Sequence, residues 1–412
     1  MAGGGCCKLA IHYATINTEQ ARGRKKSAAL LWYCPEASVS VSRHLHIVCL
    51  DAPWPADHGH AIDMMSRIAA LKKAGVCIHL HYFGPAAPPP GELSGFCHTV
   101  HEYEREKGIK KLSLPCIVSS RLNKQLVARL QQDSHPILLE GIHCTGILPE
   151  LDRRNRRIVV RMRNEESLYY KELARTGHGF LKKIYLYNES RLLRKYSHHL
   201  PDDCVYACVT EQDRAILQRD YHLSQVELLP SFPAWQQVHG EEGQGHFCLY
   251  HGNLAVPENE AAVAWLICQV FTKARVPFIV AGKKPSKKLQ RIAGLCQNTC
   301  LVADPSEKEM NDLVRKAHIH TLPCFNRNLA GNRMKLLHAL FEGRHCVANE
   351  AMVAGTGLEE ACHIGSNANA FASIILQLYH HPFTREEVVL RSELLAQYDN
   401  EANTRRLSQW LW

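Results

Sequence analysis

The segment from 331 to 358, GNRMKLLHALFEGRHCVANEAMVAGTGL, combines residue types that could bind a phosphate. Gly331 precedes a predicted helix, Lys335 lies in its first turn, and a short apolar strand follows Gly343. A glycine lets a ligand approach the backbone, and the N–H groups and dipole at a helix N-terminus favour an anion. Lys335 would add a mobile positive charge. The alternative is an ordinary amphipathic helix whose lysine is solvated.

Helical spacing sorts this segment into two faces, an apolar one expected to pack in the core and a polar one. The apolar face holds Met334, Leu337, Leu340 and Phe341, and the polar face holds Lys335, His338 and Glu342.

The segment resembles the nucleotide-sugar site of family 4-like glycosyltransferases of the two-Rossmann-domain (GT-B) fold. In that family a glycine-led loop and a lysine precede an LLEAMAxGxPVV helix–strand unit, which here reads KLLHALFEGRHCV. It is similar to a bacterial subgroup with KLLNAL in place of LLEAM, followed by MVAGTGL as at 352–358. The family's Glu-x7-Glu pair contacts the donor sugar and the ribose. It would fall on Ala330 and His338, so both carboxylates are missing here.

The resemblance implies a metal-independent glycosyltransferase. It would move a sugar from a nucleotide-diphosphate donor to a glycan or lipid-linked acceptor, with no cofactor. Two alternatives remain because the carboxylate pair is absent. One is a non-catalytic nucleotide-sugar binder or scaffold, and the other is a sugar-nucleotide epimerase of similar architecture.

Short apolar runs alternate with helical patterns from about residue 45, which predicts βαβ units on parallel sheets. The predicted strands are 44–50, 76–83, 136–141, 157–162 and 205–210, then 246–253, 277–282, 299–304, 318–324 and 345–349. We therefore expect an α/β protein with two Rossmann-like domains facing a central cleft. Its parts would be an irregular leader (1–43), an acceptor domain (44–230), a Pro- and Gly-rich hinge (231–245), a nucleotide-sugar domain (246–383) and a helix (384–412) that returns to the first domain, as the resemblance implies.

Loops of the first domain supply candidates because ligands of open α/β sheets bind outside the carboxyl ends of strands. In DAPWPADHGHAID, Gly59 would let a phosphate or sugar approach, although a Pro-rich surface turn is the alternative. LLEGIHCTG ends a strand with Glu140 and His143, and a capped strand end is its alternative. The resemblance implies that His143 lies beside the donor sugar. The candidate catalytic residues are Asp57, Glu140 and His143, and the candidate acceptor-binding residues in RMRNEESLYY are Arg163, Asn164 and Glu166.

Loops of the second domain would hold the donor. The resemblance implies that the lysines after the second strand hold the diphosphate, that backbone groups of the next loop hold the base, and that Glu359 replaces the missing ribose carboxylate. The lysines could instead form a solvated helix start. The predicted phosphate-binding residues are Lys335, Gly331, Lys283, Gly252, Asn253 and Gly59, and the predicted nucleotide-binding residues are Val302, Ala303, His338 and Glu359.

The amino-acid composition limits the classes of protein to which this chain could belong. The chain has 412 residues, is 46% apolar and 22% charged, and has no apolar run of membrane-spanning length, which is typical of a globular protein. A formal charge of +9 permits anionic ligands or peripheral contact with the inner membrane surface, but no motif indicates nucleic acid. The 17 cysteines lie mostly in apolar runs, which favours a reducing, cytoplasmic location.

A metal site is not expected from the sequence. The 25 histidines include the pairs His79/His81 and His98/His101, but none combines with cysteine at structural-zinc spacing. The chain also lacks the Asp-x-Asp motif with which another class of transferases holds a divalent cation.

Overall fold

The computed structural model describes residues 43–56, 58–84, 92–106, 113–176, 179–325 and 333–412. The predictions for the leader, for Asp57 and for Gly331 therefore concern residues outside the described ranges, apart from residue 43 of the leader. Among the described residues, no helix is both long enough and apolar enough to span a bilayer.

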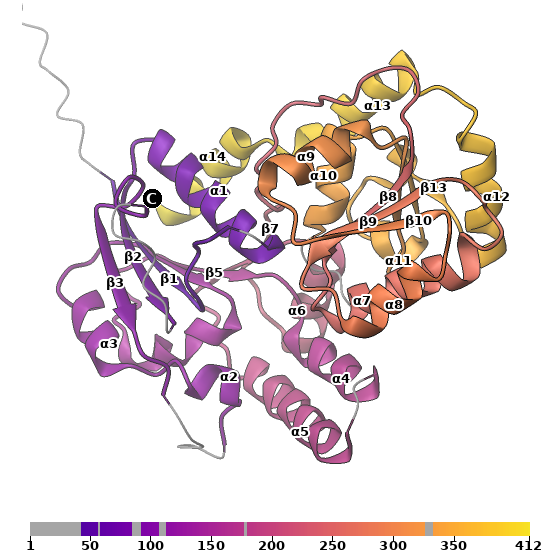
Figure 1. Ribbon diagram of the computed structural model, residues 1–412. Helices are drawn as coiled ribbons and strands as arrows, with labels where there is room; N and C mark the ends of the chain where they lie inside the picture. The colour runs from indigo at the N-terminus through magenta and orange to yellow at the C-terminus, as the bar shows by residue number, and fades with distance from the viewer. Residues whose placement is uncertain (1–42, 57, 85–91, 107–112, 177–178, 326–332) are drawn as a thin grey trace, which may run out of the picture. The chain divides into compact units, whose positions relative to one another are not determined.

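The first sheet has seven parallel strands in the order β3-β2-β1-β4-β5-β6-β7 (Figure 1). Its strands are β1 (His44–Cys49), β2 (Cys77–Phe83), β3 (Thr99–Tyr103), β4 (Ile137–Glu140), β5 (Ile158–Met162), β6 (Val205–Cys208) and β7 (Val226–Leu228). The intervening helices are α1 (Gly59–Lys73), α2 (Cys116–Ser119), α3 (Lys124–Leu130), η1 (Ile142–Glu150), α4 (Glu166–Thr176), α5 (Phe180–Ser197) and α6 (Glu211–Tyr221). Alternation along β1 places Leu45 and Ile47 in one core and Val48 in another, so both faces of the sheet are covered.

The second sheet has six parallel strands in the order β10-β9-β8-β11-β12-β13. Its strands are β8 (Cys248–Asn253), β9 (Phe278–Lys283), β10 (Thr299–Ala303), β11 (Ile319–Leu322), β12 (His345–Ala348) and β13 (His363–Ile364). Its helices are α7 (Pro257–Trp265), η2 (Leu266–Val270), α8 (Lys287–Gly294), α9 (Glu307–Lys316), α10 (Met334–Glu342), α11 (Glu350–Val353), η3 (Glu359–Ala361) and α12 (Ala368–Leu378). The prediction of two Rossmann-like parallel-sheet domains is confirmed.

The segment 384–412 forms two helices rather than the one expected. α13 (Arg385–Leu395) packs on the second domain, where Leu395 joins the core and Arg391 donates to the carbonyl of Gly343 at 2.7 Å. The turn η4 (Ala396–Tyr398) separates it from α14 (Asn400–Leu411). α14 packs beside α1 and buries Leu407 and Leu411 in the first domain's core, so the expected return to that domain is confirmed for this helix (Figure 1).

The helix α10 is buried on both faces, which corrects the expectation of an exposed polar face. His338 is 7% exposed and Glu342 is 3% exposed. Their polar atoms have partners: the His338 ring nitrogen lies 3.1 Å from Asn311 Oδ1, and Glu342 accepts from Arg315 Nε at 2.6 Å. The spacing of apolar residues identified the apolar stripe of α10. The other face can be buried as well because its polar side chains are hydrogen-bonded.

Candidate functional site

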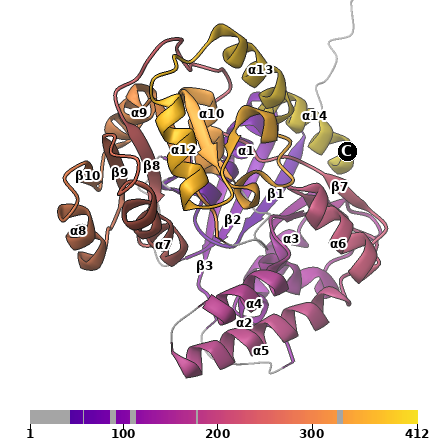
Figure 2. The same ribbon diagram turned by 90° about the vertical axis from the view of Figure 1, so that its right-hand side faces the viewer.

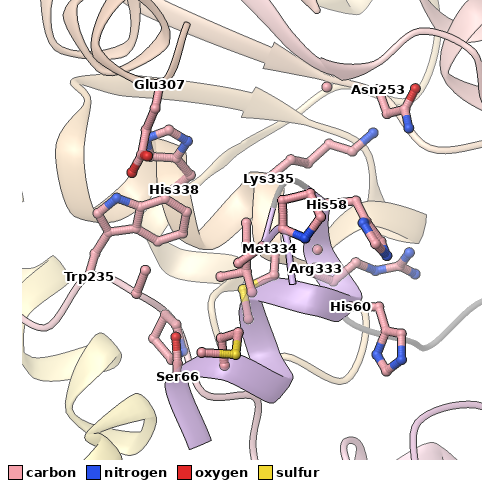
Figure 3. A pocket seen from close by; sticks show the side chains of 18 of the residues that line it. His58, His60, Ser66, Trp235, Asn253, Glu307, Arg333, Met334, Lys335 and His338 are labelled. Carbon is pink, nitrogen blue, oxygen red and sulfur yellow. The ribbon is translucent and has the colours of Figure 1, made fainter. Parts of the chain in front are cut away.

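A cavity of about 1680 Å³ is lined by residues of both sheets (Figure 3). The loop that follows β1 and the loop that follows β5 contribute from the first sheet, and the ends of β8 and β9 contribute from the second. Residues 233–237 of the connection between the sheets line it as well. The lining therefore joins the carboxyl ends of parallel strands, where open α/β sheets bind ligands.

Two helix N-termini meet at this cavity. α1 and α10 contact each other although they belong to different sheets (Figure 2). A Cβ atom on Gly59 would lie 3.2 Å from Met334 Cβ, so the absence of a side chain at Gly59 permits this close approach. Both helices direct the positive ends of their dipoles toward the cavity, which favours an anion there.

Lys335 is a half-buried cation whose hydrogen-bonding partners are neutral. Its Nζ donates to Tyr250 Oη at 3.1 Å and to Asn259 Oδ1 at 2.5 Å, and Tyr250 Oη itself donates to Asn259 Oδ1 at 3.0 Å. Burial lowers the pKa of Lys335 to about 8. Figure 3 shows the side chain extending from α10 toward Asn253. A half-buried ammonium to which no carboxylate of the described residues is bonded is poised to bind an anionic ligand.

The ends of β8 and β9 bring further predicted residues to the cavity. Gly252, Asn253 and Lys283 all line it. The Asn253 carbonyl accepts from Asn259 Nδ2 at 2.9 Å, which ties this strand end to the partner of Lys335. A Cβ atom on Gly282 would lie 1.9 Å from the Gly252 carbonyl oxygen, so the two strand ends approach each other too closely for a side chain.

Aromatic rings form another part of the lining. His338 stacks on Trp235 with ring centroids 4.0 Å apart and planes 11° apart (Figure 3). The ring of His251 meets that of His338 edge-on at 5.1 Å. His251 is 4% exposed, and both of its ring nitrogens are buried. Burial lowers its pKa to about 3, so the ring is neutral at pH 7.

The first sheet contributes a cluster of His143, Arg163, Asn164 and Glu166 to the lining. Arg163 donates to His60 Nδ1. Burial lowers the pKa of His143 to about 3 and raises that of Glu166 to about 7, against the opposing charge of Arg163. The His143 Nδ1 and Asn164 Oδ1 atoms are buried without a partner among the described residues. These groups could therefore bind the hydroxyls of a ligand.

Glu140 does not line the cavity. It is 1% exposed and accepts from Arg67 Nη2 at 2.6 Å and from Arg67 Nε at 3.1 Å. Arg67 also donates to Asp63 Oδ2 at 3.0 Å. Glu140, the last residue of β4, thus belongs to a buried ion cluster within the first domain, whereas His143 in the following η1 lines the cavity.

Val302, Ala303 and Glu359 also lie outside the lining. Ala303 and Glu359 are exposed, and Val302 packs against a small cluster beside β10. The same loop reaches the cavity a few residues later. Its lining residues are Pro305, Ser306 and Glu307, followed by Met310 and Asn311 of α9.

Several lining residues were not predicted from the sequence. Trp235 lies in the segment assigned only a hinge role, His251 is the residue before the predicted Gly252, and Arg333 precedes the α10 helix. A tryptophan inside a Pro- and Gly-rich connection and a histidine at a strand end were the features that could have indicated them.

Among known proteins, no family model matches the chain. A curated relative from Klebsiella pneumoniae, an uncharacterized 44.6 kDa protein in the cps region, is 25% identical over 339 residues, which covers 76% of this chain and 84% of that protein.

Solved structures match over most of the chain at low sequence identity. A variant of S. aureus TarM in complex with Fondaparinux, alpha-GlcNAc-glycerol and UDP has a TM-score of 0.63 at 10% identity and covers 90% of this chain and 99% of that one. WaaG, a glycosyltransferase involved in lipopolysaccharide biosynthesis, has a TM-score of 0.59 at 11% identity and covers 89% and 99%. Apo OtsA has a TM-score of 0.57 at 12% identity and covers 90% and 99%. The two parallel sheets and these matches show that the chain has the GT-B fold.

Proposed function

We propose that this chain is a glycosyltransferase that moves a sugar from a nucleotide-diphosphate donor to a glycan or lipid-linked acceptor. The observation that carries the proposal is Lys335, a half-buried cation bonded to the neutral side chains of Tyr250 and Asn259 at the edge of a large cavity. The GT-B fold and the sequence resemblance to family 4-like enzymes with KLLxAL in place of LLEAM agree with this function. TarM and WaaG, which share the fold, were respectively solved with UDP and described as a glycosyltransferase.

The proposed chemistry uses the charges that surround the cavity. The bond between the sugar C1 and the leaving phosphate oxygen breaks, and its electron pair stays on the diphosphate. The acceptor hydroxyl oxygen bonds to C1 as its O–H bond breaks, and the proton passes to the departing diphosphate. Lys335 and the dipoles of α1 and α10 would stabilise the departing diphosphate. Lys283 and Arg333, which also line the cavity, would add positive charge, so we expect no metal ion in donor binding.

The cluster on the first sheet would bind the acceptor. Glu166 has a pKa of about 7, so its carboxylate form is abundant at neutral pH and can accept a hydrogen bond from an acceptor hydroxyl. The unpaired Nδ1 of His143 can accept another.

The test is a titration of UDP and of a panel of nucleotide sugars, followed by assays for donor hydrolysis and transfer. Binding in excess chelator together with turnover would support the proposal. Binding of nucleotide sugars without hydrolysis or transfer would instead indicate a non-catalytic binder, and an epimerised donor would indicate an epimerase. Absence of any nucleotide binding would refute both the transferase and the binder.

We also propose that the chain binds a membrane surface through α5, because this helix exposes a patch of basic and apolar side chains. The exposed fractions along this helix are 77% for Phe180, 81% for Leu181, 52% for Ile184, 48% for Tyr185 and 53% for Tyr187. Lys182 and Lys183 are exposed between them. A helix that combines aromatic and aliphatic side chains with lysines suits the interface of an anionic bilayer. α5 packs against α4, whose residues Glu166 and Tyr169 line the cavity, so a lipid-linked acceptor could reach the site along this hairpin.

The double variant Lys182→Gln/Lys183→Gln should weaken binding to anionic vesicles roughly 30-fold, at about 1 kcal/mol for each lysine near the surface. Phe180→Ser/Leu181→Ser should weaken binding to the same vesicles at least tenfold, since it removes inserted apolar area. The measurement is co-sedimentation with phosphatidylglycerol-containing and with neutral vesicles.

The matched control is Leu295→Ser, which alters a side chain that is 84% exposed on α8's C-cap and should leave vesicle binding unchanged. Equal binding by all variants would refute the patch. Concentration-dependent self-association that is lost in Phe180→Ser/Leu181→Ser would show that the patch joins two copies of the chain instead.

A further inference from the structure

Histidines gather on one face of the first sheet, at the amino ends of β1 and β2. His44 and His46 alternate along β1, and His79 and His81 alternate along β2, so all four side chains project from the same face. The two strands are parallel with His46 opposite His79. This register brings His44 Nδ1 to 2.9 Å from His79 Nε2.

A fifth histidine comes from a separate part of the chain. His135 lies between α3 and β4, and its ring stacks on that of His44 with centroids 4.7 Å apart and planes 15° apart. Its centroid is 6.0 Å from that of His79. One ring nitrogen from each of these three residues lies within 4.8 Å of the other two. All three side chains are partly accessible to solvent.

These spacings suit a single bound cation after a small adjustment. Two imidazole nitrogens bound tetrahedrally to one zinc ion at about 2.0–2.1 Å lie roughly 3.4 Å apart. The stacked rings must rotate about χ2 to point their nitrogens at a common centre, and this torsion is soft for histidine.

Neighbouring groups already hold the imidazole of His79 and the backbone of His135. The other ring nitrogen of His79, Nδ1, lies 2.9 Å from Thr99 Oγ1 on β3, and a proton on Nδ1 leaves Nε2 as the nitrogen with a lone pair. The backbone N–H of His135 donates to Asp133 Oδ1 at 2.9 Å, and Arg156 Nη2 donates to the same carboxylate oxygen at 2.9 Å. The loop that carries His135 is therefore anchored to the sheet.

We propose that His44, His79 and His135 bind one transition-metal dication of the class that prefers imidazole ligands, with Zn²⁺ as the representative. Three protein ligands leave a fourth position for water, and the exposed His98, whose ring centroid is 5.4 Å from that of His79, is a further imidazole nearby. The proposed site differs from the expectation, drawn from spacing along the sequence, that the chain has no metal site.

The place of this site indicates a structural role. The cavity is lined by residues that follow the carboxyl end of β1, whereas His44 is the first residue of that strand. A bound ion would cross-link β1, β2 and the α3–β4 connection, so it would be separate from donor binding.

The experiment titrates Zn²⁺ alone into the full chain after removal of metal, in competition with a chromophoric chelator. We expect one tight site per chain. His135→Gln should weaken it at least tenfold, since loss of groups that merely orient metal ligands already costs about 10- to 100-fold. His44→Gln should weaken it similarly, and Thr99→Val should weaken it by a smaller factor because it removes the partner of His79.

The matched control is His199→Gln, which removes an exposed histidine outside the group of His44, His79 and His135 and should leave zinc binding unchanged. Circular dichroism in chelator should show that every variant remains folded. Unchanged stoichiometry and affinity in His135→Gln and His44→Gln, or an equal loss in His199→Gln, would overturn the proposal, because zinc would then bind surface histidines indiscriminately.

Discussion

Arg67→Met should lower the free energy of unfolding by about 3–5 kcal/mol, the cost of leaving a buried charge without its partner. Arg67 is 1% exposed and bridges two buried carboxylates, Asp63 on its own helix and Glu140 at the end of β4. Methionine fills similar volume but supplies no hydrogen-bond donor. The Phe232 backbone N–H still donates to Asp63 at 2.7 Å, so the loss would fall mainly on Glu140.

Urea denaturation of the variant and the native chain measures this effect. Burial raises the pKa of Glu140 even with Arg67 present, so this carboxyl binds a proton more readily in the folded state than in the unfolded chain. Removing Arg67 should raise that pKa further. Because the folded variant then binds a proton more readily than the unfolded chain does, its stability deficit should narrow as the pH falls from 7 toward 5.

The control is Arg214→Met, which breaks an i,i+3 pair with Glu211 in which the two side chains are 37% and 62% exposed. A loss below about 1 kcal/mol is expected there, as for other exposed ion pairs. If Arg67→Met also lost less than that, the buried cluster would not stabilise the first domain.

Lys335→Met should weaken UDP binding roughly 10- to 150-fold, which corresponds to the 1.5–3 kcal/mol of a charge-assisted hydrogen bond. The same change should leave the free energy of unfolding unchanged or higher. The ammonium has neutral partners, and after its removal Tyr250 Oη still donates to Asn259 Oδ1. Methionine at this position therefore leaves no buried donor or acceptor unsatisfied. It also removes the free-energy cost of burying the ammonium charge. Titration calorimetry and urea denaturation measure the two effects separately.

The pH dependence of UDP binding gives an independent check on Lys335. With a pKa of about 8 the lysine loses its charge as the pH rises through that value, so native affinity should fall between pH 7 and pH 9. The affinity of Lys335→Met should stay flat over this range. Lys287→Met, which alters an exposed lysine on α8, serves as the matched control and should behave as the native chain. A native profile without this fall, or an unweakened Lys335→Met, would place the diphosphate elsewhere.

Ten of the strands could be predicted from apolar runs, and the three that were missed share one property. β3, β7 and β13 all lie at an edge of their sheet. An edge strand is covered less completely, so its sequence need not be apolar, as TVHEY in β3 and VEL in β7 illustrate. Hydrophobic periodicity reports burial, and it fades where burial is partial.

The candidate site shows a second limit of prediction from the sequence, because the role of a residue can depend on a contact far away along the chain. Predicted residues at the ends of central strands divide into two groups: Gly252 and Asn253 of β8 line the cavity, whereas Glu140 of β4 does not. Glu140 and Glu166 are both glutamates close to strand ends, yet one is neutralised by Arg67 and the other lines the cavity. That distinction depends on a helix residue 73 positions away from Glu140, a separation that motif spacing cannot reveal.

The return of α14 to the first domain has a consequence for how the chain is made. Leu407 and Leu411 are buried with Leu45 and Met64, residues that a ribosome synthesises some 340 or more positions earlier. At a synthesis rate of about 5–20 residues per second, the first domain waits for tens of seconds before its core can be completed. During that interval the surface of α1 that α14 later covers is apolar and accessible. The nascent chain therefore passes through an aggregation-prone stage, and the second domain can finish folding before the first.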